Sequence, residues 1–165
     1  MNEHLNNFLK AQKRYGAYEF EAVEKKLPDN GVYLIFGKNA EIVKVGANKE
    51  KGEGALAKEL RKAFFNNKSG LNQLHKKIAL DLNGGYSMAA IFEYWRYALT
   101  KRNSSGIIWD RDAVLKMREL ERKIVLQIRE TYSFSVLALS DDEGRLALEA
   151  TIKTSLQSIL SPPLN

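Results

Sequence analysis

Two residues of a predicted β-hairpin could act together on a proton. Tyr33 lies in the apolar run 32–36 and Lys44 in the run 41–45, and the four residues 37–40 between the runs suit a hairpin loop. A symmetric loop pairs Tyr33 directly with Lys44, with their Cβ atoms about 5 Å apart on one face. A lysine ammonium lowers the pKa of a neighbouring phenol, which would make Tyr33 a proton acceptor near neutral pH. The alternative is an ordinary strand tyrosine that packs on the core beside a solvated lysine.

A single carboxylate near the end of the chain is the second chemical feature. Glu149 lies at the edge of an apolar stripe that Leu148, Ile152 and Leu156 form at helical spacing. Glutamate is seldom buried unless it is paired or binds a metal. The alternative is a surface glutamate that pairs with Lys153 one helical turn later.

Basic side chains follow the hairpin in a predicted helix over 55–66, which carries Lys58, Arg61 and Lys62. The chain has a formal net charge of +6 and a pI of about 9.4. This excess of positive charge is compatible with a polyanionic partner such as nucleic acid. The alternative is a solvated basic helix face.

Composition excludes several classes of site and of protein. The chain has 165 residues, of which 44% are hydrophobic, so it can form a real core. It has no cysteine, which excludes disulfides, thiolate zinc sites and cysteine nucleophiles. No apolar run reaches membrane-spanning length, and the N-terminus lacks the pattern of a signal peptide. We therefore expect a soluble, intracellular protein of the cytoplasm that has no membrane partner.

The hydrophobic pattern predicts one α+β domain over residues 1–165. A helical region over 1–26 precedes the hairpin, and a strand over 131–139 precedes a last helix that begins at a capping box formed by Ser140 and Glu143. Residues 68–130 form a helical insertion, with helices expected over 71–82, 87–100 and 111–130.

Four segments follow one another along the chain in an order that is more specific than any one segment alone. They are 27–36 (LPDNGVYLIF), 43–46 (VKVG), the basic helix with Arg61, and an ending that runs from 149–152 (EATI) to 162–165 (PPLN). This order resembles the GIY-YIG nuclease superfamily, in particular its restriction and repair endonucleases. The resemblance implies a small three-stranded antiparallel sheet flanked by helices, here with residues 68–130 as a helical insertion.

The resemblance also implies an activity and assigns roles to residues. Tyr33 would activate the attacking water, with Lys44 at the place of the second motif tyrosine. Arg61 would hold the scissile phosphate, Glu149 would be the single ligand of Mg²⁺ or Mn²⁺, and Asn165 would be the asparagine near the active site. The family hydrolyses phosphodiesters to 5′-phosphate and 3′-hydroxyl ends, so the implied function is a metal-dependent DNA endonuclease. We expect the first four of these residues to converge on one concave, basic face.

The sequence leaves other surfaces and other functions open. Lys58 and Lys62 are further candidates for phosphate contacts, and Lys101 and Arg102 would contact DNA from a loop in the insertion. The alternative for the insertion is a plain helical subdomain, and a homodimer is also open. A nucleic-acid-binding module that keeps the fold without turnover, or a helical protein-interaction domain, would fit the same composition.

Overall fold

The computed structural model describes residues 11–65, 73–82, 87–100 and 109–160, together with Glu3 and Leu9. The chain divides into two compact units. The first unit consists of Met1–Arg61 and Thr131–Asn165, and the second unit is Lys62–Glu130. The expected insertion, residues 68–130, lies within the second unit.

The first unit is built on an antiparallel sheet, which confirms the α+β class. Four strands pair in the order β1-β4-β2-β3, namely β1 (Tyr15–Gly16), β4 (Ser133–Ala138), β2 (Gly31–Phe36) and β3 (Ile42–Ala47). The prediction of three strands is therefore wrong by one. The extra strand β1 has two residues and pairs with Phe134 and Ser133. A two-residue strand is too short to show an alternating pattern, so the sequence indicated only a helix break at Gly16.

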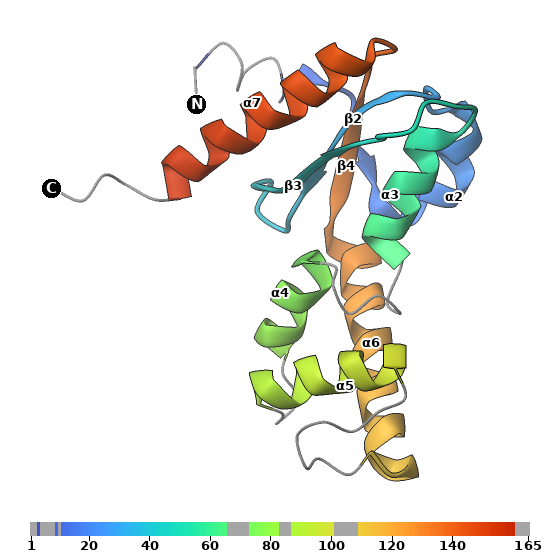
Figure 1. The fold of residues 1–165 in the computed structure, drawn as a ribbon, viewed down its shortest axis with the longest axis vertical. Helices are drawn as coiled ribbons and strands as arrows, with labels where there is room; N and C mark the ends of the chain where they lie inside the picture. Colours follow the sequence, from blue (N-terminus) through green and yellow to red (C-terminus); the bar gives the residue numbers. More distant parts are fainter. Residues whose placement is uncertain are drawn as a thin grey trace, which may run out of the picture. The chain divides into compact units, whose positions relative to one another are not determined.

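Helices cover both faces of this sheet (Figure 1). On one face Val32, Leu34 and Phe36 form a core with Ile152 of α7 (Asp142–Leu160). Tyr33 and Ile35 alternate with these residues and therefore point to the other face. That face lies against α3 (Ala55–Phe65) and the short α2 (Phe20–Val23), as the T-shaped contact of Phe20 with Phe134 shows.

The expected helical region over 1–26 is confirmed only in pieces. After β1 the chain forms the 3-10 helix η1 (Ala17–Glu19), then α2, then the 3-10 helix η2 (Glu24–Lys26). Most of residues 1–10 lie outside the described residues. These short helices bring the chain to the turn at 27–30, which leads directly into β2.

The start of α7 is fixed by a cap and by a buried arginine. Asp141 accepts a hydrogen bond from the Gly144 amide at 2.6 Å, so the cap is Asp141 and the predicted capping box of Ser140 and Glu143 is wrong. Arg145 is 0% exposed, and its guanidinium donates to the carbonyl oxygens of Asn48 at 2.7 Å and of Leu139 and Ser140 at 3.4 Å. One side chain thereby ties α7 to the ends of β3 and β4.

The described residues of the second unit form three helices, close to the expected ranges. They are α4 (Gln73–Leu82), α5 (Met88–Thr100) and α6 (Arg111–Thr131). The ring of Trp109 lies 5.3 Å from that of Tyr94 and 6.1 Å from that of Tyr97, which joins α5 to the segment before α6. Within the described part of the chain, no helix is both long and apolar enough to span a membrane.

Candidate active site

The register of the hairpin differs from the predicted one by two residues. Tyr33 pairs with Gly46, and Lys44 pairs with Ile35, so the predicted direct pairing of Tyr33 with Lys44 is wrong. The cause lies in the loop and in a bulge beside it. The Gly37 amide donates to the Glu41 carbonyl at 2.8 Å, and the register shifts between Ile35 and Phe36. A shift of two residues keeps side chains on the same face, so Tyr33 and Lys44 remain diagonal neighbours.

Gly46 makes room for the phenol ring of Tyr33. A Cβ atom at residue 46 would lie 2.7 Å from Cε1 of Tyr33, and nearer still to Cζ and the hydroxyl oxygen. The ring therefore lies across β3, which is the edge strand of the sheet. Tyr33 is only 4% exposed, so its hydroxyl is held over the sheet edge in a largely dry setting.

Charged groups from two helices act on this hydroxyl. Burial raises the pKa of Tyr33, and the negative charges of Glu59 and Glu149 raise it further. Glu59 belongs to α3 and Glu149 to α7, so the two carboxylates reach Tyr33 from helices on opposite faces of the sheet. The sequence predicted the reverse, a pKa lowered by Lys44. That prediction is wrong, and Tyr33 is a neutral phenol that can donate a hydrogen bond.

Lys44 is shifted toward its neutral form. It is half-buried on β3, and burial lowers its pKa, as does the positive charge of Lys153, while Glu59 opposes both effects. A lysine with a lowered pKa is a better proton acceptor near neutral pH than an exposed one. The cluster therefore offers one hydrogen-bond donor, Tyr33, and one potential base, Lys44.

Glu149 is partly buried and forms an ion pair within its own helix. Its side chain is 14% exposed and pairs with Lys153, whose side chain is 52% exposed. This is the surface pairing that the sequence left as the alternative for Glu149. We call Tyr33, Lys44, Glu59, Glu149 and Lys153 the Tyr33 cluster. Three of the predicted residues, Tyr33, Lys44 and Glu149, are linked in it by charge: Glu149 raises the pKa of Tyr33, and its ion-pair partner Lys153 lowers the pKa of Lys44.

Glu59 is a member of the cluster that the sequence analysis did not select. The signal was present, since Glu59 lies at helical spacing beside the buried Leu56 and Leu60 of α3. A carboxylate at the edge of a buried stripe deserves the same consideration that Glu149 received. The sequence pattern singled out only the basic residues of the same helix.

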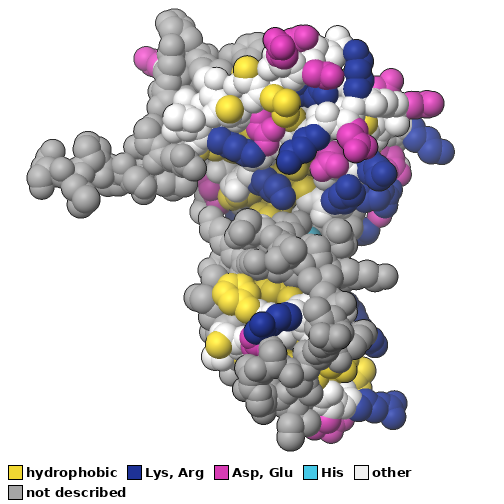
Figure 2. All heavy atoms as spheres, in the orientation of Figure 1, with side chains coloured by type: hydrophobic (Ala, Val, Ile, Leu, Met, Phe, Trp, Pro, Cys, Tyr) yellow, Lys and Arg dark blue, Asp and Glu magenta, His cyan; other side chains and the backbone are white. Residues whose placement is uncertain are grey.

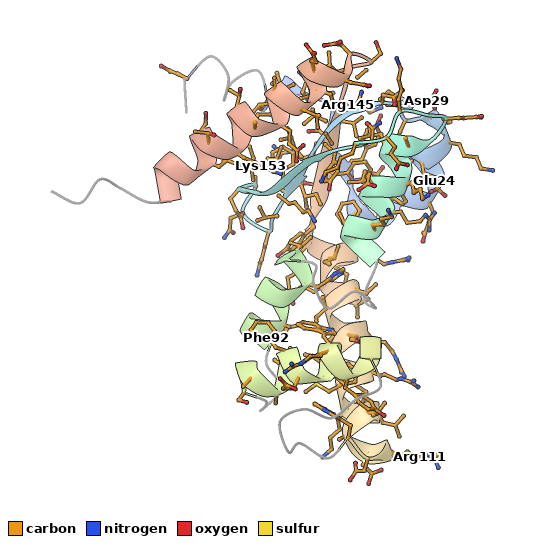
Figure 3. All side chains as sticks on the ribbon, viewed as in Figure 1. Glu24, Asp29, Phe92, Arg111, Arg145 and Lys153 are labelled. Atoms are coloured by element: carbon orange, nitrogen blue, oxygen red, sulfur yellow. The ribbon has the colours of Figure 1, made fainter. Side chains whose placement is uncertain are left out.

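Arg61 lies elsewhere on the first unit. Two residues along a helix turn the side chain by about 200°, so Arg61 points away from Glu59. Its Nη2 donates to both carboxylate oxygens of Glu24 at 2.6 and 2.7 Å, and its guanidinium lies 5.2 Å from the ring centre of Phe20. Figure 3 labels Glu24 and Lys153, the partners of Arg61 and Glu149, at well-separated places on this unit. The structure does not bring Arg61 to the Tyr33 cluster.

Arg61 and Lys58 instead border a separate cavity of about 590 Å³. Its lining includes both acidic and basic side chains. The lining residues are Glu24, Lys25, Leu27, Asp29, Glu53, Gly54, Ala57, Lys58 and Arg61. On the face that Figure 2 shows, basic and acidic side chains likewise intermingle over the first unit. Lys62 is exposed on α3. Asn165, Lys101 and Arg102 lie outside the described residues.

The carboxylate oxygens of Glu59 and Glu149 are of the kind that hard divalent cations take as ligands. Among the described residues no three His, Cys, Asp or Glu side chains gather at one point. Mg²⁺ commonly binds through one or two carboxylates and takes its other ligands from water and from phosphate. Glu149 would be the principal protein ligand, and its Lys153 partner is exposed enough to move aside.

Comparisons with family models, with curated proteins and with solved structures find no match for this chain. The chemistry of the site therefore has to be inferred from its own residues. The arrangement joins a buried phenol donor, a lysine shifted toward its neutral form and a carboxylate pair. These groups could hold a water molecule and accept its proton, and tyrosine, lysine and glutamate side chains can also act as nucleophiles themselves.

Proposed function

We propose that this protein is a metal-dependent DNA endonuclease of the GIY-YIG type, with the Tyr33 cluster as its active site. The observation that carries the proposal is that, besides burial and Glu59, the negative charge of Glu149 on α7 raises the pKa of Tyr33 on β2, although the two residues stand far apart in the sequence. The motif resemblance assigns the same two residues to one active site. Glu149 belongs to α7, which packs on Val32 and Leu34, and its charge still acts on Tyr33 of the same strand β2.

The residues of the chain have complementary tasks in this proposal. The Tyr33 hydroxyl donates a hydrogen bond to a phosphate oxygen or holds the attacking water. Lys44, in its neutral form, accepts the proton that this water loses. Mg²⁺ or Mn²⁺ at Glu149 would supply positive charge where negative charge develops on the phosphate. The buried setting of Tyr33 strengthens the electrostatic interactions of its hydroxyl.

Lys153 has a role that the sequence did not suggest. It neutralises Glu149 and lowers the pKa of Lys44. In the proposal it holds the carboxylate until a cation replaces it, and it helps to keep Lys44 in the proton-accepting form. Arg61 would contact DNA outside the cluster, after the phosphate displaces Glu24.

A second candidate is a nucleic-acid-binding module of the same fold without turnover. The specific observation in its favour is the ion pair of Glu149 with Lys153, which satisfies the carboxylate without a metal. The two candidates differ in one experiment. Purified protein is incubated with supercoiled plasmid DNA in the presence of Mg²⁺ or of EDTA, and the product ends are tested for 5′-phosphate by ligation. The proposal expects nicked or linear DNA with ligatable ends in Mg²⁺ alone, whereas binding without any cleavage supports the second candidate.

A further inference from the structure

Helix α6 of the second unit carries its arginines in a line. Arg111, Arg118, Arg122 and Arg129 follow one another at intervals of seven, four and seven residues. At 3.6 residues per turn these intervals place all four within an arc of about 40° around the helix axis. We call this set the arginine stripe. The buried side of α6, formed by Met117, Leu120, Ile124 and Ile128, is centred about 130° away by the same geometry.

The arginine stripe faces outward for most of its length. Arg111, Arg118 and Arg122 are exposed and Arg129 is half-buried. Figure 3 labels Arg111 at the end of α6, where its side chain projects from the helix. A hydrogen bond from Arg118 to Tyr94 fixes one member, and this bond lowers the pKa of Tyr94 against the larger effect of burial.

Acidic residues of α6 lie outside the stripe. Asp112, Glu119 and Glu130 project about 80° to 100° away from it by helical geometry. Glu121 is turned toward α5, where it accepts a hydrogen bond from Trp95. Like charges one turn apart, such as Arg118 and Arg122, destabilise an isolated helix by about 0.2–0.5 kcal/mol. Glu121 also stands three residues after Arg118, whose charge lowers its pKa, so this arginine of the stripe has an acidic neighbour.

The dimensions of the stripe match a nucleic-acid backbone. At 1.5 Å per residue, the four arginines span about 27 Å along the axis. Duplex DNA presents one negative charge per about 1.7 Å of its axis, and its major groove, about 12 Å wide, admits an α-helix. Arginine binds phosphate through two parallel hydrogen bonds. We propose that the arginine stripe of α6 binds the phosphate backbone of duplex DNA, an inference that takes DNA as the partner from the proposed function.

The test measures the salt dependence of binding rather than cleavage. A fluorescent 20-base-pair duplex is titrated with protein in EDTA at several salt concentrations, and affinity is read from anisotropy. The test variant is Arg111→Gln with Arg122→Gln, which leaves the Arg118 contact intact. The control is Lys116→Gln with Lys123→Gln, because both lysines are exposed on another side of the same helix. Each pair removes the same charge, and glutamine is a good helix former.

Each phosphate contact contributes about 0.9 to the slope of log affinity against log salt. The arginine variant should therefore reduce the magnitude of that slope by about 1.8, and the lysine control should leave it at the wild-type value. Equal losses in both variants, or an unchanged slope in the arginine variant, overturn the inference. So does arginine-dependent binding to vesicles of anionic lipid with unchanged binding to duplex DNA.

The result of this binding experiment does not depend on the result of the plasmid cleavage assay. Wild-type protein that binds with a stripe-dependent slope but never cleaves DNA would support the inference and contradict the proposed endonuclease. If wild-type protein cleaves DNA in Mg²⁺ while the arginine variant binds like wild type, the result supports the proposed endonuclease and contradicts the inference. Helix content and thermal unfolding of both variants, followed by circular dichroism, confirm that each remains folded.

Discussion

Replacing Gly46 with alanine should destabilise the first unit through a single collision with Tyr33. The added Cβ would lie 2.7 Å from Cε1 and closer to the end of the ring, whereas carbon atoms in contact prefer a separation of about 3.5–4.0 Å. The ring is almost fully buried and cannot swing into solvent without giving up its packing. Overpacking of this kind costs about 1–3 kcal/mol, and we expect the free energy of unfolding to fall by that amount.

The assay is urea unfolding followed by circular dichroism, with Gly52→Ala as the matched control. A Cβ at Gly52 meets nothing within 4 Å, so this variant should unfold like wild type. The collision is isolated by repeating Gly46→Ala in a Tyr33→Leu background, because leucine lacks the ring atoms that the new Cβ would meet. We expect the cost to disappear there, giving a coupling free energy of about 1–3 kcal/mol. An equal cost in both backgrounds would refute the assignment of Gly46 as the space for the phenol.

Three further predictions concern charged groups. Arg145→Ala leaves buried carbonyl oxygens without a donor and opens a cavity, so the free energy of unfolding should fall by about 3–5 kcal/mol in a urea titration. Burial raises the pKa of Glu121 in the folded protein, so the ionised carboxylate destabilises the fold once the pH exceeds the pKa that Glu121 has in the unfolded chain. Glu121→Gln should therefore have a higher melting temperature than wild type at neutral pH, and the difference should disappear in acid. Because the charge of Glu59 raises the pKa of both Tyr33 and Lys44, Glu59→Gln should lower both pKa values in NMR titrations of labelled side chains. If neither pKa changes, Glu59 does not belong to the Tyr33 cluster.

The strands and helices of the described chain could largely be predicted because their signals are local. The β-branched run 32–36 predicted β2 (Gly31–Phe36), and helical spacing predicted α3 (Ala55–Phe65) and α6 (Arg111–Thr131) within a few residues. The two-residue strand β1 could not be predicted. It is a strand only because Ser133 and Phe134 of β4 supply its partners.

The register of the hairpin could not be predicted from the local sequence pattern alone. It depends on the backbone of the loop, where Ala40 adopts a φ of 61°, and on a bulge that inserts one residue into β3. The direction of the Tyr33 pKa shift was missed for a related reason. It depends on burial and on carboxylates that the fold brings from α3 and α7. Neither can be predicted from the neighbouring lysine of the hairpin.

The sequence selected residues whose charges act on one another in the structure, but it did not predict how they are arranged. Tyr33 and Glu149 were selected as a pair, and in the structure the charge of Glu149 raises the pKa of Tyr33. Arg61 was selected from its place on a basic helix, which does not say which side of that helix meets the site. Its ion pair with Glu24 depends on the short helices before β2, whose conformation the sequence did not reveal.

The most direct measurement is single-turnover cleavage of plasmid DNA in Mg²⁺ by wild-type protein, by Glu149→Gln and by Glu143→Gln. Both substitutions remove one carboxylate from α7, but Glu143 is exposed at the start of the helix, away from the proposed site. An endonuclease that uses Glu149 as its metal ligand loses cleavage in Glu149→Gln and keeps the wild-type rate in Glu143→Gln, while both variants still bind the duplex. Equal rates in all three proteins, or no cleavage by any of them, would contradict the assignment of the Tyr33 cluster as a nuclease active site.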